Sequence, residues 1–125
     1  DVVICSNMYG DIFADLASEL AGGLGLGGSI NASNDVCIAQ CAHGSAPDIA
    51  GRNIANPTAM IISCTMMLTW LAARHDNPKF QKAALSLEGA LAAQLLDGRT
   101  RDLGGEMDCD AFAAAVAEKV HNHHP

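Results

Sequence analysis

The chain has 125 residues, the size of a single domain, and half of them are hydrophobic, so the sequence can bury a sizeable core. Its formal net charge is −7 and it has no run of Lys or Arg, which argues against nucleic acid and anionic membrane surfaces as partners. Five irregularly spaced cysteines are typical of free thiols in a reducing compartment, and we expect a cytoplasmic protein.

The first part of the chain predicts a strand, a helix and a second strand. Residues 1–6 form an apolar run that indicates a buried strand, and residues 11–21 carry apolar side chains at helical spacing. The glycines of residues 22–28 end this helix, and residues 29–34 favour a loop. Residues 36–39 predict a second short strand, which leads into a loop rich in turn residues.

A long helix is predicted over residues 57–74. Asn56 supplies an N-cap and Pro57 a first-turn proline, so the helix starts at a defined place. The segment is apolar nearly all round, and we therefore expect it to contact protein on most sides. Its apolar run is too short and too often interrupted to span a bilayer.

Two more helices are predicted towards the end of the chain. Asn77 and Pro78 begin one that stops at Gly98, and Asp108 or Asp110 caps the last one. Short strands that alternate with helices in this way indicate an α/β protein.

Asp11 and Asp15 lie four residues apart, so both carboxylates project from one face of the first predicted helix. Like charges at this spacing repel each other, and no Lys or Arg lies nearby in the sequence. A divalent cation such as Mg²⁺ or Mn²⁺ would relieve the repulsion, because hard cations take carboxylate oxygens as ligands. The alternative is a solvated acidic face assisted by the positive N-terminus of the helix.

Residues 43–57 combine glycines, a hydroxyl and a carboxylate in one loop that runs into a helix. Gly44 and Gly51 let the backbone approach a ligand closely, and Ser45 with the neighbouring amides can donate to phosphate oxygens. Asp48 is a carboxylate of the kind that binds ribose hydroxyls. These features favour a nucleotide-binding loop. The alternative is a surface turn with a helix cap, since Gly, Pro, Asp and Asn are ordinary turn residues.

Residues 23–28 fit the G-x-G-x-x-G pattern of Rossmann dinucleotide domains. That pattern normally follows a strand and opens a helix, whereas this stretch follows a predicted helix and opens onto a predicted loop. We therefore reject the Rossmann interpretation and expect these glycines to let the chain cross between domains.

Four separated motifs resemble, in the same order, those of the metal-dependent β-decarboxylating dehydrogenases, the isocitrate and isopropylmalate dehydrogenase family. They are residues 7–12 with Asp15, residues 22–26, residues 43–57 and residues 100–105. The resemblance implies the non-Rossmann α/β fold of that family, with this chain as its C-terminal portion. Residues 1–30 would be the C-terminal strand and helix of the smaller, dimer-forming domain, and residues 31–125 the C-terminal part of the larger, cofactor-binding domain.

The resemblance also implies an NAD site. Asp48 with Ile49 is the NAD-type pair, since NADP-using relatives tend to carry Lys-Tyr there. Asp48 would hold the adenosine ribose hydroxyls, while the histidine and the last asparagine of the loop would contact adenine. Gln40 departs from the family, where a glutamate usually faces the nicotinamide side. The implied cofactor-binding residues are Asn7, Gln40, His43, Gly44, Ser45, Ala46, Pro47, Asp48, Ile49 and Asn56.

In the same family, Asp11 and Asp15 correspond to two aspartates that bind Mg²⁺ or Mn²⁺. A third aspartate comes from the neighbouring subunit of a dimer, so we expect a homodimer or a higher homo-oligomer. That aspartate, the substrate-binding arginines and the proton-transferring Lys and Tyr would precede this chain. We therefore expect no catalytic residue within residues 1–125 and no activity from them alone.

The activity that the resemblance implies is NAD-dependent oxidation and decarboxylation of a malate-type 2-hydroxy acid. Tyr9 and the stretch 22–26 are slightly more similar to the isocitrate branch, and 3-isopropylmalate, tartrate or homoisocitrate are the alternative substrates. A non-catalytic regulatory subunit of the same fold, with which Gln40 is compatible, is another alternative. A third is a module that serves packing and assembly only.

Overall fold

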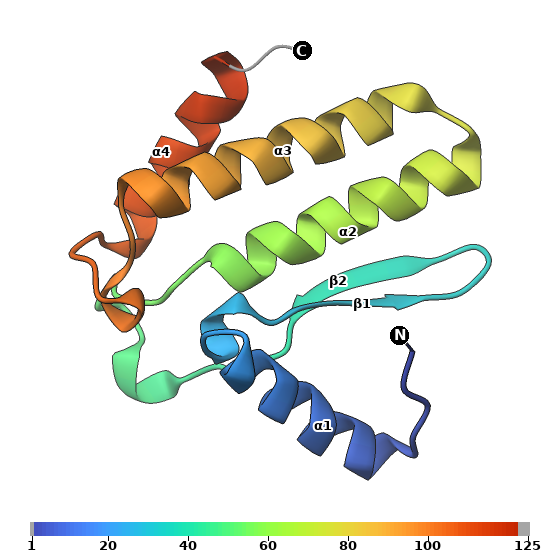
Figure 1. The fold of residues 1–125 in the computed structure, drawn as a ribbon, viewed down its shortest axis with the longest axis horizontal. Helices are drawn as coiled ribbons and strands as arrows, with labels where there is room; N and C mark the ends of the chain where they lie inside the picture. Colours follow the sequence, from blue (N-terminus) through green and yellow to red (C-terminus); the bar gives the residue numbers. More distant parts are fainter. Residues whose placement is uncertain (1, 123–125) are drawn as a thin grey trace.

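The computed structural model describes residues 2–122, which form helices, short 3₁₀ turns and one β-hairpin (Figure 1). In chain order the elements are α1 (Asn7–Leu20), η1 (Leu24–Leu26), β1 (Gly28–Ala32), β2 (Cys37–Cys41), η2 (Pro47–Ile49), α2 (Thr58–His75), α3 (Pro78–Asp97), η3 (Arg101–Leu103) and α4 (Cys109–Asn122).

The hairpin and three of the helices form the packed part of the molecule. β1 and β2 are antiparallel, with Ile30 opposite Ala39, and α2 lies between this hairpin and α3 (Figure 1). Ser63 joins α2 to both strands, since its hydroxyl accepts from the Ser29 N–H at 3.0 Å and donates to the Gln40 carbonyl at 2.6 Å. The core lies between α3 and α4, where Phe112 is fully buried. The other buried residues of this cluster are Ala90, Leu91 and Val116.

α3 begins at Pro78, as predicted, and α2 begins at Thr58, one residue after its predicted start. The side chain of Asn56 accepts a hydrogen bond from the Thr58 N–H at 3.0 Å, and the side chain of Asn77 accepts one from the Lys79 N–H at 3.0 Å. These contacts satisfy backbone donors that have no partner inside a helix. α3 ends immediately before Gly98, as predicted. Within residues 2–122, no helix has the length and apolarity needed to cross a bilayer.

Two predictions about the N-terminal part are wrong. Residues 2–6 are not a buried strand: Val2 and Ile4 are 88% and 94% exposed, and no other strand in the described chain pairs with them. Asp1 lies outside the described residues. Residues 28–32 are a strand and not a loop, because pairing with β2 and contact with α2 outweigh the weak strand propensity of Gly and Asn. α1 is a helix as predicted, but it begins at Asn7, four residues earlier.

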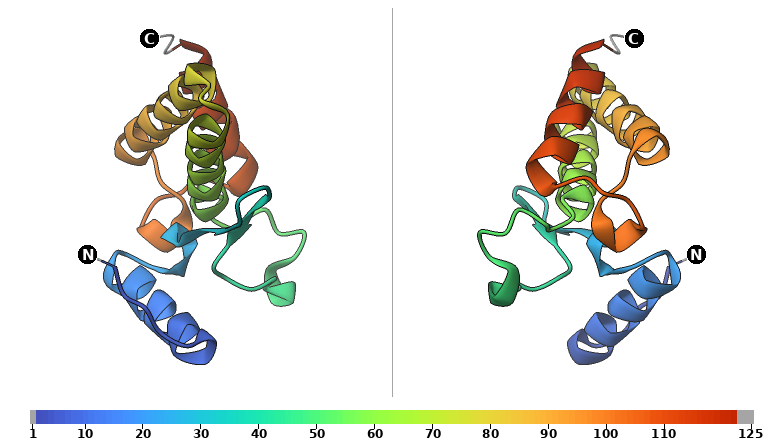
Figure 2. Two further views of the ribbon diagram at one scale, coloured as in Figure 1. Left: turned by 90° about the vertical axis from the view of Figure 1, so that its right-hand side faces the viewer. Right: turned by 90° about the vertical axis from the view of Figure 1, so that its left-hand side faces the viewer.

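α1 and the segment that contains η2 extend away from the helical layer (Figure 2). α1 has no buried residue, and it packs mainly against η1. α2 is less enclosed than its sequence predicts, since Met60 and Met66 are 43% and 38% exposed. Both helices therefore present apolar side chains that the described part of the chain does not cover.

Candidate functional site

An open cavity of about 860 Å³ lies where the loop between β2 and α2 meets η1, η3 and the start of α4. The loop follows the end of β2 at Cys41 and runs to the start of α2 at Thr58. The lining residues are Gly25, His43, Gly44, Ser45, Ala46, Ile49, Ala50, Gly51, Asn53, Ile54, Ala55, Asn56, Asp102, Cys109 and Asp110.

The first half of the loop is exposed and has polar groups available. His43 Nδ1 lies 2.9 Å from the carbonyl oxygen of Gly44, and residues 43–48 are all solvent-exposed. Within residues 2–122 the hydroxyl of Ser45 has no hydrogen-bond partner in the protein. Ala46 has a φ of 43°, in the left-handed region, and its carbonyl accepts from the Ile49 N–H at 3.1 Å. This turn leaves a hydroxyl beside the cavity that can donate to a ligand oxygen.

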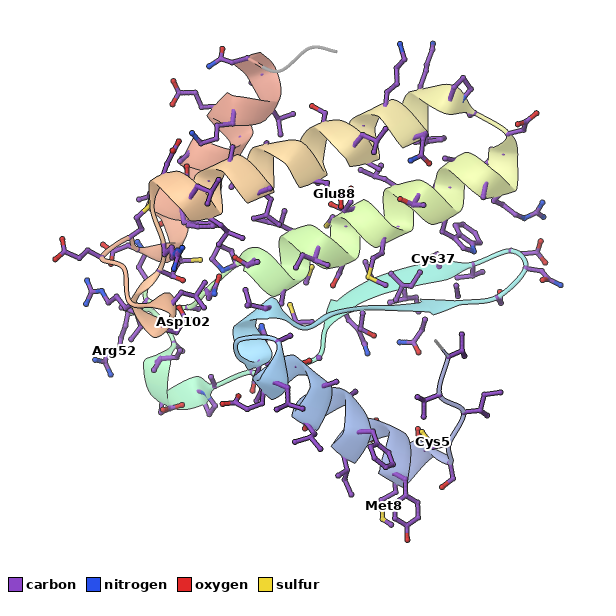
Figure 3. All side chains as sticks on the ribbon, viewed as in Figure 1. Cys5, Met8, Cys37, Arg52, Glu88 and Asp102 are labelled. Carbon is purple, nitrogen blue, oxygen red and sulfur yellow. The ribbon has the colours of Figure 1, made fainter. Side chains whose placement is uncertain are left out.

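The second half of the loop is anchored by a small hydrogen-bond network. Asn56 Nδ2 donates to Asp102 Oδ2 at 2.9 Å, and the hydroxyl of Thr100 donates to Asp102 Oδ1 at 2.6 Å. Gly25 lies against the same pair, because a Cβ at that position would be 3.0 Å from Asp102 Oδ2. A larger residue at Gly25 would therefore press on the network. Figure 3 shows Asp102 at the corner where η3 meets the loop.

Asp102, Gly25, Cys109 and Asp110 also line the cavity, and none of them was among the predicted cofactor-binding residues. Residues 100–105 were part of the resemblance, and this was the only sequence signal for Asp102. Burial raises the pKa of the Cys109 thiol, and the neighbouring Asp110 carboxylate raises it further. The thiol is therefore neutral near pH 7, which makes it a poor nucleophile there.

Six of the predicted cofactor residues lie together in the cavity wall: His43, Gly44, Ser45, Ala46, Ile49 and Asn56. Pro47 and Asp48 belong to η2, and Asp48 is exposed at the edge of the loop instead of in the lining. Gln40 is in β2, where its backbone carbonyl binds Ser63 and the residue is exposed. Asn7 is the first residue of α1 and also lies outside the lining.

Asp11 and Asp15 are both exposed on α1. Neither makes an ion pair with a residue in the described chain, so their mutual repulsion is not relieved by Lys or Arg. Within residues 2–122 no group of three or more His, Cys, Asp or Glu side chains is arranged to hold a metal ion. The described residues therefore offer two carboxylates on this face of α1 and no third side-chain ligand beside them.

The hairpin, the loop and the helical layer define an α/β protein with an open cavity at a strand–loop–helix junction. The family model described as isocitrate/isopropylmalate dehydrogenase matches residues 1–119. The chain therefore belongs to the isocitrate/isopropylmalate dehydrogenase family, as its motifs predict.

The similar proteins agree with this assignment. The chain is 46% identical over 120 residues to "Isocitrate dehydrogenase [NAD] subunit 2, mitochondrial" of Kluyveromyces lactis, covering 95% of this chain and 32% of that protein. It is 46% identical over 121 residues to "Isocitrate/homoisocitrate dehydrogenase" of Thermus thermophilus, covering 96% and 34%.

A solved structure of isocitrate dehydrogenase from Methylococcus capsulatus matches with a TM-score of 0.79 and 39% identity, covering 91% of this chain and 33% of that one. The fold is therefore of the isocitrate/isopropylmalate dehydrogenase type, as the sequence predicts. The chain spans about a third of the length of these relatives.

Proposed function

We propose that this chain is the C-terminal, cofactor-binding part of an NAD-dependent enzyme that oxidises and decarboxylates a malate-type 2-hydroxy acid, with isocitrate as the first candidate. The observation that carries the proposal is the cavity beside residues 43–56, where six of the ten predicted cofactor residues meet. The names of the Kluyveromyces and Thermus relatives support isocitrate, and the former also supports NAD.

The cavity fits a dinucleotide chemically. The Ser45 hydroxyl lacks a partner in the described chain, and Gly44 has open space around the position of a Cβ, so both can approach a phosphate closely. The amide of Asn56 is held by Asp102 beside the cavity, where it can present polar atoms to a base. Asp48, exposed on η2, would accept hydrogen bonds from the ribose hydroxyls and favour NAD over NADP.

Asp11 and Asp15 would hold Mg²⁺ or Mn²⁺. Their carboxylates come from successive turns of α1 and have no cationic partner in the described chain. When bound, such a cation polarises the oxygen atoms of a hydroxy acid and stabilises developing negative charge. Asp11 and Asp15 would each provide a carboxylate oxygen to the cation.

A second copy of the protein would cover α1 and complete the cation site. The uncovered apolar side chains of α1 are 54–82% exposed, and a surface of this kind marks an interaction site. They are Met8, Tyr9, Ile12, Phe13, Leu16 and Leu20. Met8 is labelled at the far end of α1 in Figure 3. A symmetric dimer would bury these side chains and bring ligands from the partner near Asp11 and Asp15.

The direct test is formation of NADH by the complete protein with isocitrate and Mn²⁺, followed before and after addition of EDTA. We expect turnover that EDTA abolishes and Mn²⁺ restores. 3-Isopropylmalate and homoisocitrate, assayed in parallel, identify the substrate branch. Binding of NAD without turnover of any of the three acids would favour a non-catalytic subunit. That alternative is supported by Gln40, which stands where the family usually has a glutamate.

A further inference from the structure

Asn53 makes two hydrogen bonds to the first turn of α4, although 57 residues separate Asn53 from Asp110. Its backbone carbonyl accepts from the Cys109 N–H at 2.9 Å, and its side-chain Oδ1 accepts from the Asp110 N–H at 3.1 Å. The φ of Asn53 is 56°, in the left-handed region. Asn is among the few residues other than Gly that adopt this region readily.

These two bonds replace the usual local cap of α4. The first N–H groups of a helix have no partner inside the helix, and the residue just before it normally supplies a side-chain acceptor. Asp108 occupies that position, but its carboxylate pairs with Arg101 at 2.9 Å. The expectation that Asp108 or Asp110 caps α4 is therefore corrected, because the side-chain cap comes from Asn53 in the loop.

The cap forms part of the cavity wall. Asn53, Cys109 and Asp110 all line the cavity, together with Asn56 three residues further along the loop. The loop is thus attached at two points: Asn53 binds α4, and Asn56 binds Asp102. Between these points the chain has little freedom to move relative to the last helix.

We propose that Asn53 is a positioning residue for the dinucleotide site. By capping α4 with its carbonyl and its side chain, Asn53 holds residues 50–56 against the last helix and fixes the wall on which the cofactor binds. This inference rests on the proposed function of the same cavity. Asn meets two requirements at once at this position, a left-handed backbone and a side-chain acceptor.

The test compares Asn53→Gly and Asn53→Asp in the complete protein. Glycine keeps the left-handed backbone but removes the side-chain acceptor, and we expect KM for NAD to rise about fivefold, the scale of one lost hydrogen bond. Aspartate keeps an acceptor at the positive end of α4, so KM for NAD should stay within about twofold of wild type. In both variants kcat and KM for the hydroxy acid should be unchanged.

Asn77→Gly is the matched control, because Asn77 caps α3 through the same kind of bond, to the Lys79 N–H at 3.0 Å, and does not line the cavity. It should lower the melting temperature about as much as Asn53→Gly and leave KM for NAD unchanged. Hydrogen exchange at the amide of Asp110 should accelerate in Asn53→Gly and remain slow in Asn77→Gly and Asn53→Asp.

The outcomes separate the two proposals. If the wild-type protein binds no NAD, the proposed function fails, and the positioning role fails with it. If NAD binds but Asn53→Gly has the wild-type KM, or if Asn77→Gly raises KM equally, the positioning role of Asn53 is overturned while the proposed function stands. If aspartate fails to rescue NAD binding, the side-chain acceptor is not what positions the loop.

Discussion

Asn56 and Asp102 are 46 residues apart in the sequence, yet Asn56 Nδ2 donates a hydrogen bond to Asp102 Oδ2 at 2.9 Å. Asp102 is in turn held by the hydroxyl of Thr100, a fully buried residue, at 2.6 Å. The amide at the end of the loop is therefore fixed to the packed part of the molecule through two bonds. These bonds hold the side chain of Asn56 in the cavity wall in the absence of a ligand.

Replacing Asp102 by Ala should weaken NAD binding without changing the rate of the chemical step. The variant loses a charge-assisted bond to Asn56, worth roughly 1.5 kcal/mol, so KM for NAD should rise about tenfold at unchanged kcat. Steady-state kinetics at saturating hydroxy acid measure this. Asp97→Ala is the control, since it removes an exposed carboxylate paired with Lys119 outside the cavity. Equal effects of the two variants would contradict a specific role for Asp102.

Replacing Asp15 by Asn should abolish turnover and the response to Mn²⁺ while leaving the fold intact. Because one of two repelling carboxylates is removed, the metal-free protein should become more stable by about 0.2–0.5 kcal/mol. Activity as a function of Mn²⁺, together with thermal melting in EDTA, measures both effects. Glu19→Gln, one turn further along α1, should also relieve repulsion but keep the Mn²⁺ response. An active Asp15→Asn variant with normal Mn²⁺ dependence would remove Asp15 from the cation site.

The free cysteines should react with iodoacetamide in a defined order. Cys5 is exposed and should be modified first. Burial raises the pKa of the Cys41 and Cys109 thiols, so less of each is in the reactive thiolate form, and their modification should lag until the pH is raised. NAD should slow the modification of Cys109, which lines the cavity, more than that of Cys41. Peptide mass spectrometry with and without NAD gives the rates, and equal protection of both cysteines would argue against this cavity.

Replacing Gly28 or Gly89 by Ala should change the stability of the protein in opposite directions. A Cβ at Gly28 would lie 2.5 Å from Ile62 Cγ2, so Gly28→Ala should destabilise the protein by about 1–3 kcal/mol through overpacking between β1 and α2. Gly89 lies inside α3 with nothing within 4 Å of its Cβ position. Gly89→Ala should therefore stabilise the helix by about 0.5–1 kcal/mol. Chemical denaturation of both variants tests the packing of the hairpin on α2.

Local signals predicted most of the helices. Asn77 with Pro78 and the terminating Gly98 act within one or two turns, so the bounds of α3 follow from neighbouring residues alone. β1 was not predicted, because its stability depends on pairing with β2 and on the bond between the Ser29 N–H and the Ser63 hydroxyl, 34 residues away. Residues 2–6 do not form the predicted strand for the converse reason, because no strand among residues 2–122 pairs with them.

The candidate site was predictable only in part. Residues 43–49 are contiguous, so their turn chemistry and resemblance are visible in the sequence. Asp102 and Asn53 act through contacts that span 46 and 57 residues, and no local pattern indicates such contacts. Their roles required knowledge of which segments the fold brings together.

The most direct test of the account is the cofactor preference of wild type and of Asp48→Lys combined with Ile49→Tyr. A carboxylate at Asp48 accepts bonds from ribose hydroxyls but repels a 2′-phosphate, which lowers the affinity for NADP. Measured as kcat/KM for each cofactor with isocitrate and Mn²⁺, wild type should prefer NAD, and the double variant should lose NAD use and gain NADP use. A wild type that prefers NADP, or a double variant whose preference does not move, would contradict the assignment of residues 43–56 as the NAD site.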